Sequence, residues 1–221
     1  TTYQDALDIL GRYGVNAPAA VTAHLQRGAR GEIPETPKPG DKVFARVENR
    51  VVATAHRSLQ AAAEFLGTQG IRAAILGDSV TGEAREVAKV YAALASEVLR
   101  HGQPWQRPVA LISGGECTVT VRGDGRGGRC AEFLLALAVE LGGARDVWAL
   151  ACDTDGIDGT EDNAGAVLTP DALKRATASG KNAERLLDNN DGYGFFEALG
   201  DLVTTGPTRT NVNDYRVILL A

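Results

Sequence analysis

The sequence contains no methionine and few aromatic residues, histidines or cysteines. Among 221 residues, aromatics make up 5%, and there are three His and three Cys. A chain that starts at Thr1 without an initiating Met is expected to be a processed or excised part of a longer protein. No apolar run approaches the roughly 20 residues of a membrane helix, so we expect no membrane partner. The net charge of −5 also argues against nucleic acid, because binding a phosphate backbone requires a basic surface.

The few cysteines and the first residues predict a cytoplasmic protein. Cys117, Cys130 and Cys152 are odd in number and show no CxxC spacing, which favours reduced thiols over a disulfide framework. We expect them to be small buried side chains. The first ten residues lack the basic and apolar regions of a signal peptide.

Glycine is abundant, and from residue 42 onward short apolar runs alternate with helical periodicity. This alternation predicts an α/β protein, namely a three-layer, Rossmann-like fold with a mixed, mostly parallel sheet and flanking helices. We expect short helices within 1–30, a proline-rich connector at 33–40, and mixing of strand directions by a hairpin-like unit at 109–122. Strands are predicted at 51–55, 73–76, 109–112, 118–122, 147–152 and 216–220, with helices at 59–66, 82–99, 129–141, 171–179 and 182–187.

Four polar turns stand out because three of them follow predicted strands and the fourth leads into one. Ligands of open α/β sheets bind at the carboxyl ends of strands, where helix N-termini converge. The first turn is Ser113-Gly114-Gly115-Glu116. Its glycines allow close approach of the backbone to an anion, and Glu116 is a candidate to bind a metal or a hydroxyl. The alternative is a tight bend between strands.

The second turn, residues 123–129, contains a literal GxGxxG at Gly123, Gly125 and Gly128. This pattern before a helix makes a nicotinamide-dependent enzyme a competing hypothesis. Against it, the preceding segment alternates in polarity, whereas the first strand of a dinucleotide-binding unit is a buried apolar run. Arg129 adds a cation suited to a phosphoryl or carboxylate group.

The third and fourth turns, 153–159 and 205–214, are rich in carboxylates, hydroxyls and amides. Asp155 and Asp158 follow a buried strand, where Mg²⁺ bridged to phosphates is typically held by one or two carboxylates; the alternative is aspartates that cap turns. The fourth turn offers groups able to hold a small hydroxylated acid or a phosphate.

Together these turns resemble the glycerate 2-kinase (MOFRL) family, whose members are often named hydroxypyruvate reductases. The resemblance rests on 113–116 with 118–120, Gly125 with 127–129 and Glu132, 154–159 with 164–166, and 205–208 with 210–214, and upstream on 35–38 and 82–85. It implies phosphorylation of D-glycerate by ATP with Mg²⁺, in a cleft between two α/β domains, and is compatible with a homodimer.

The resemblance also implies roles for individual residues. Arg129 and Asp155 are the implied catalytic residues, and Asp155 and Asp158 the implied metal ligands. Substrate or nucleotide is expected to contact Ser113, Gly114, Gly115, Glu116, Gly125, Gly127, Gly128, Thr154, Thr205, Gly206, Thr208, Asn211 and Asn213.

Three departures from the family pattern involve four positions. Cys130-Ala131 replaces Asn-Gln, Asp153 replaces a glycine, and Arg209 replaces another glycine, from where it is expected to pair with Asp153 or reach a phosphate. Residues 1–104 correspond to a remnant of the N-terminal glycerate kinase domain and 105–221 to the MOFRL-type domain, so the chain is expected to lack part of the active site. The alternatives are a hydroxypyruvate reductase and a non-catalytic ligand-binding module.

Overall fold

The computed structural model describes all 221 residues, in two compact units, Thr1–Val51 and Val52–Ala221. The first unit contains helices α1 (Tyr3–Arg12) and α2 (Ala19–Ala29) and the short helix η1 (Lys42–Phe44). Helix α1 begins with a capping box, in which Thr2 and Asp5 exchange side-chain hydrogen bonds with each other's backbone N–H. The predicted short helices and the irregular connector at 33–40 are confirmed.

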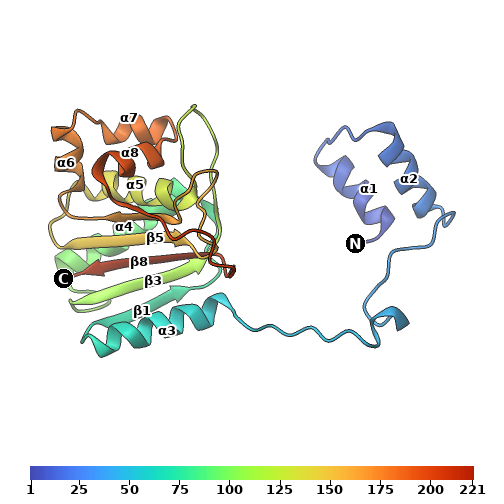
Figure 1. The fold of residues 1–221 in the computed structure, drawn as a ribbon, viewed down its shortest axis with the longest axis horizontal. Helices are drawn as coiled ribbons and strands as arrows, with labels where there is room; N and C mark the ends of the chain where they lie inside the picture. Colours follow the sequence, from blue (N-terminus) through green and yellow to red (C-terminus); the bar gives the residue numbers. More distant parts are fainter. The chain divides into compact units, whose positions relative to one another are not determined.

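The second unit is built on a six-stranded sheet (Figure 1). Its spatial order is β1 (Arg72–Gly77), β3 (Val109–Gly115), β8 (Asp214–Leu220), β5 (Val147–Asp153), β6 (Gly165–Leu168) and β7 (Leu202–Val203). Only β1 and β3 pair in parallel; every other neighbouring pair is antiparallel. The last strand of the chain therefore lies between β3 and β5, in the middle of the sheet.

Helices cover both faces of this sheet (Figure 1). Helices α4 (Ala84–His101) and α5 (Arg129–Leu141) pack on one face, and α3 (Ala55–Thr68) packs on the other. Successive strand residues point to opposite faces, so Leu111 joins the α4 and α5 core whereas Ile112 contacts the α3 side. The short helices α6 (Ala172–Ala178), α7 (Ala183–Asp188) and α8 (Gly192–Leu199) pack around α5. None of the helices combines the length and apolarity needed to cross a bilayer.

The α/β class, the mixed sheet and the helices on both faces are confirmed, whereas two details of the sheet differ. The sheet was expected to be mostly parallel, and four of its six strands, β1, β3, β5 and β7, do run in one direction. However, β8 and β6 lie between most of them, so only β1 and β3 are parallel neighbours. The expected hairpin at 109–122 is wrong: β4 (Cys117–Thr118) leaves the main sheet and pairs in parallel with β2 (Gly82–Glu83). Mixing of strand directions comes instead from β8 and β6.

The strand expected at 51–55 is also wrong. These residues are exposed or half-exposed and form no strand, and Thr54 caps α3 by accepting a hydrogen bond from the Arg57 N–H. The boundary predicted near residue 104 coincides with no division in space, because β1 and α4 share the core of the main sheet. The assignment of 1–104 to an N-terminal kinase domain stays a prediction.

Candidate active site

Arg129, the first residue of α5, is where the four polar turns meet. Its Nε donates a hydrogen bond to Asp214 Oδ1 (2.8 Å), and its Nη2 donates to Asp153 Oδ2 and lies 3.5 Å from Glu116 Oε1. Glu116 belongs to the first turn, Asp153 to the third and Asp214 to the end of the fourth, while Arg129 ends the second. We call these four residues, with Arg216, the Arg129 cluster.

The carboxylates of the cluster hold Arg129 as a cation at a partly open position. Asp153 and Asp214 are buried, whereas the Arg129 side chain is 21% exposed. Burial raises the pKa of Asp153, against the opposing effect of the Asp155 N–H and of Arg129. Burial by itself lowers the pKa of Arg129, but Asp214 and Asp153 outweigh it and raise that pKa. The guanidinium therefore stays charged.

Arg216 supports the cluster from inside the core. It is 1% exposed, and its Nη2 donates to Asp214 Oδ2 (2.5 Å) and contacts Cys117 Sγ (3.2 Å). Its Nη1 donates to the Gly114 carbonyl oxygen (3.2 Å), and the guanidinium lies 5.4 Å from the centre of the Phe133 ring. Neither Arg216 nor Asp214 is among the site residues expected from sequence. A charged residue at a core-facing position of an otherwise apolar strand was the available signal.

Asp158 caps the N-terminus of α5. Its Oδ1 accepts the Cys130 N–H (3.0 Å) and its Oδ2 accepts the Ala131 N–H (2.8 Å), which satisfies helix donors that otherwise lack partners. The carboxylate is fully buried, and burial raises its pKa to about 6.

The predicted metal pair gains no support from this geometry. Both Asp158 oxygens are engaged by the helix, so Asp158 does not fit a metal ligand. No group of three or more His, Cys, Asp or Glu side chains is arranged to hold a metal ion. Asp155 uses Oδ1 to accept the Ile157 N–H (2.9 Å) and remains half-buried.

The raised pKa of Asp158 predicts a dependence of stability on pH. The Asp158 carboxyl group binds its proton more tightly in the folded chain than in the unfolded chain, so protonation of Asp158 stabilises the fold. This stabilisation is fully present below pH 3.8 and is lost as the pH rises through about 6. We expect the free energy of unfolding to fall by up to about 3 kcal/mol across this window. Urea unfolding at pH 4 to 7 measures it. The slope should flatten in Asp158→Asn, and equal slopes in both proteins would contradict this assignment.

The first predicted turn is largely a continuation of strand β3. Ser113, Gly114 and Gly115 are buried and pair with Arg216, Tyr215 and Asp214 of β8. At Gly115, φ is +103° and an added Cβ would lie 2.2 Å from the Val80 nitrogen, so glycine is required by backbone packing. Only Glu116 of this turn is exposed, beside Arg129.

The third and fourth turns are joined by hydrogen bonds. The Thr208 N–H donates to the Asp155 carbonyl oxygen (2.9 Å), and Thr154 Oγ1 donates to the Asn213 carbonyl oxygen (2.7 Å). The remaining predicted residues of the fourth turn make local contacts: Thr205 Oγ1 donates to the Gly206 carbonyl oxygen, and Asn211 Oδ1 accepts the Asn213 N–H.

Arg209 does not pair with Asp153. It is exposed, has φ of +61° and forms no ion pair, because Arg129 already pairs with Asp153. The expected Arg209–Asp153 contact is therefore wrong, and a contact between Arg209 and a phosphate stays a prediction.

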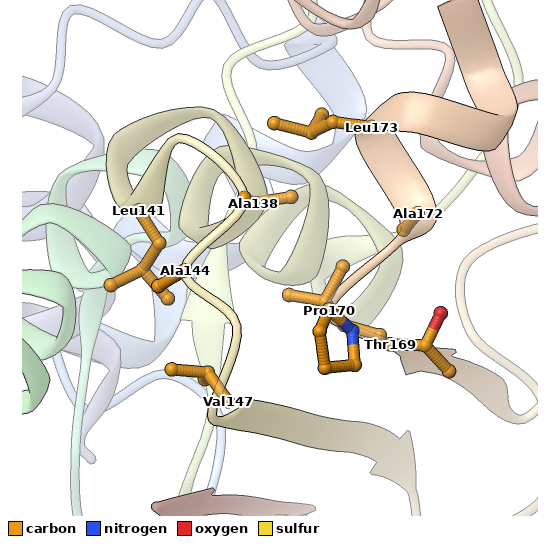
Figure 2. Close-up of a pocket in the computed structure, with 10 residues that line it drawn as sticks. Ala138, Leu141, Ala144, Val147, Thr169, Pro170, Ala172 and Leu173 are labelled. Atoms are coloured by element: carbon orange, nitrogen blue, oxygen red, sulfur yellow. The ribbon is translucent and has the colours of Figure 1, made fainter. Parts of the chain in front are cut away.

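A pocket of about 370 Å³ lies beside the joined turns. Asp153, Thr154, Thr205 and Thr208 line it on one side, and residues of α3 line it on the other. A second hollow, at the opposite end of α5, is enclosed by apolar side chains such as Leu141 and Leu173 (Figure 2). Its volume of about 10 Å³ makes it a packing gap with no room for a substrate.

The glycines of the second turn serve packing against residues 189–193. The Gly125 N–H donates to the Asn189 carbonyl oxygen (3.0 Å), and the Arg126 N–H donates to Asp191 Oδ1 (3.2 Å). Added Cβ atoms at Gly123 and Gly125 would lie 2.2 Å and 2.5 Å from oxygen atoms of Asn189. The segment before the turn is strand only at β4, so the GxGxxG does not form the strand–turn–helix unit of a dinucleotide site.

This packing predicts a matched pair of glycine substitutions. Gly125→Ala is expected to lower the free energy of unfolding by about 1–3 kcal/mol, because the methyl group would overlap backbone. Gly67→Ala, at an exposed position in the last turn of α3 with no atom within 4 Å of an added Cβ, should raise the free energy of unfolding by about 0.5–1 kcal/mol. Chemical denaturation measures both, and a neutral Gly125→Ala would show that the loop does not dock as described.

Several donors beside the cluster remain without a protein partner. The backbone N–H groups of Gly127, Gly128 and Arg129 donate to no protein acceptor, and neither does Arg129 Nη1. Successive free N–H groups at the start of a helix, next to a cation, are suited to binding an anion. The structure thus brings Arg129, Glu116, Gly127 and Gly128 together, with Thr154 and Asp155 close by.

Comparisons with known proteins show which proteins this chain is similar to. The MOFRL family matches residues 109–214. The whole chain aligns with half of the D-glycerate 2-kinase of Thermotoga maritima at 34% identity. It also aligns, at 46% identity, with 49% of the length of an Agrobacterium vitis protein that carries the provisional name hydroxypyruvate reductase. The crystal structure of the Thermotoga maritima glycerate kinase superposes with a TM-score of 0.82 at 34% identity, covering all of this chain and 51% of that one. The chain spans about half the length of these relatives.

Proposed function

We propose that this chain, which is similar to glycerate kinases along its full length and to the MOFRL family over residues 109–214, carries the Arg129 portion of the active site of a glycerate kinase. The proposed reaction transfers the terminal phosphoryl group of ATP to D-glycerate. The observation that carries the proposal is the convergence of the four turns on Arg129, which keeps one free guanidinium donor beside three free backbone N–H groups.

Phosphoryl transfer needs stabilisation of negative charge more than it needs a covalent catalyst. Arg129 Nη1 and the N–H groups of Gly127 and Gly128 would bind oxygen atoms of the phosphoryl group or of the glycerate carboxylate. Asp153 and Asp214 would fix the guanidinium plane, so that little reorganisation accompanies the reaction. Hydroxyls and amides of the joined turns would orient glycerate beside the pocket of about 370 Å³.

Mg²⁺ would neutralise charge on the nucleotide phosphates. The accessible carboxylates suited to it are Asp155 and Glu116, since Asp158 is occupied as a helix cap. A role for Asp155 near the metal therefore stays part of the proposal, and one for Asp158 does not. A cytoplasmic location and a homodimer stay predictions.

Two parallel assays test the proposal on the full-length protein that carries this sequence. One follows phosphoglycerate formation from ATP and D-glycerate, and the other follows NADH oxidation with hydroxypyruvate. We expect product only in the first. Turnover only in the second would establish a reductase, the alternative suggested by the names of some relatives. Binding of glycerate or nucleotide without either turnover would indicate a ligand-binding module.

A further inference from the structure

A groove of about 620 Å³ lies between the start of the second turn and helix α7. Its charged lining residues are Arg122, Lys181, Arg185 and Asp188. The side chains of the three cations are exposed and form no ion pair or hydrogen bond. Three cations without ion pairs therefore face one carboxylate, Asp188, in the groove, and Glu86 lies near Arg122, in a protein whose net charge is −5.

Other arginines near this region have acidic partners. Arg85 pairs with Glu132, and Arg126 lies 2.9 Å from Glu197. Lys181 and Arg185, by contrast, are four residues apart on one side of the groove, and Arg122 comes from the other. Three cations and one carboxylate line the groove, so an anion bound there would offset the repulsion among the cations.

The two sides of the groove are held at a fixed separation by a buried network. Asn190 Oδ1 accepts the N–H groups of Arg122 (2.6 Å) and Gly123 (3.2 Å). Asn190 Nδ2 donates to Glu132 Oε2 (2.8 Å), and Glu132 is paired with Arg85 in the core. A groove fixed in this way pays little ordering cost when a ligand binds.

We propose that this groove binds a small molecule through a phosphate group that carries two or more negative charges. Arg122 contacts the phosphate from the loop side, and Lys181 and Arg185 contact it from the α7 side. Guanidinium groups suit this role because they donate paired hydrogen bonds to phosphate oxygens. The site is additional to the proposed kinase function, since it shares no residue with the Arg129 cluster, and a bound anion would add to the contacts that already hold the loop leading to Arg129 beside α7.

The test is calorimetric titration of the whole chain with inorganic pyrophosphate at fixed ionic strength. The groove variant is Arg122→Ala with Arg185→Ala. The control is Arg145→Ala with Lys174→Ala, which removes the same charge from exposed cations outside the groove. We expect the groove variant to weaken binding about 10-fold or more, and the control to change it less than about 2-fold. Equal weakening in both, or no measurable binding to the unaltered chain at millimolar pyrophosphate, would overturn the proposal.

A second arm separates this site from the Arg129 cluster. Pyrophosphate also suits the proposed phosphoryl site at Arg129, so the readout is the binding event that the groove variant removes. Arg129→Ala should leave the affinity of that event within about 2-fold, whatever it does to glycerate phosphorylation. Hydrogen exchange should slow at residues 122–126 when pyrophosphate is bound, since the anion would add to the hydrogen bonds that already hold these residues to residues 189–191. Loss of binding in Arg129→Ala, or exchange unchanged in this loop, would place the anion elsewhere and overturn the proposal.

Discussion

Replacing Asp214 by alanine is expected to lower the free energy of unfolding by about 3–5 kcal/mol, because it leaves the buried Arg216 cation without a carboxylate partner. Asp214 is the only carboxylate paired with Arg216, whose side chain is 1% exposed. The same change removes the Nε acceptor of Arg129. Urea unfolding followed by circular dichroism at pH 7 measures the loss.

A double substitution shows whether the charge is the cause. Asp214→Ala combined with Arg216→Met removes both charges and refills part of the core, and apolar replacement of a buried ion pair is often nearly neutral. We expect the double variant to regain most of the stability lost in Asp214→Ala. If the single substitution costs less than about 1 kcal/mol, or if the double variant is the less stable of the two, the pair does not act as described.

Arg129→Ala is expected to lower kcat/KM for D-glycerate by about 10²–10³, which is the usual effect of removing a donor that stabilises charge in a transition state. The kcat/KM of Arg129→Lys should lie between those of the unaltered protein and Arg129→Ala, since an ammonium group keeps the charge but lacks the planar guanidinium fork. Steady-state kinetics of the full-length protein with ATP and D-glycerate provide the measurement.

Arg126 offers a matched control in the same loop. It is an exposed arginine that pairs with Glu197 and lies 4.5 Å from the centre of the Tyr193 ring, outside the Arg129 cluster. Arg126→Ala should therefore change kcat/KM by less than about 3-fold, as surface changes usually do. Equal losses in both variants would point to disruption of the loop, and unchanged kinetics in Arg129→Ala would refute its assigned role.

Local patterns predicted most elements of the fold, because they report burial and periodicity. The apolar face of Leu59, Ala62 and Leu66 became α3, and the run at 147–152 became β5. The order of strands was not predictable in this way. Residues 216–220 read as a terminal strand, but their insertion between β3 and β5 depends on pairing between distant segments, which local periodicity does not encode.

The sequence predicted which kinds of residue make up the candidate site, but not the role of each residue in it. The sequence placed glycines and polar groups at the ends of strands, and the structure brings those turns together. It did not distinguish Asp158, which caps a helix, from Asp153, which holds Arg129. That distinction depends on which N–H groups and cations lie within about 3 Å, a property of the folded chain. For the same reason, the GxGxxG pattern matched a dinucleotide motif although its glycines pack against residues 189–193.

The central position of β8 has a consequence for how the chain folds during synthesis. Strands β3 and β5 have no direct hydrogen bonds to each other, and each pairs with β8 along its length. Until the ribosome has made this last strand, the sheet exists only as two separate groups, β1–β3 and β5–β6–β7, each with an unpaired edge. Such edges are aggregation-prone, and pairing between distant segments is slow. Folding of the second unit is therefore expected to wait for β8, with the Arg129 cluster among the last parts to form because β8 supplies Asp214 and Arg216.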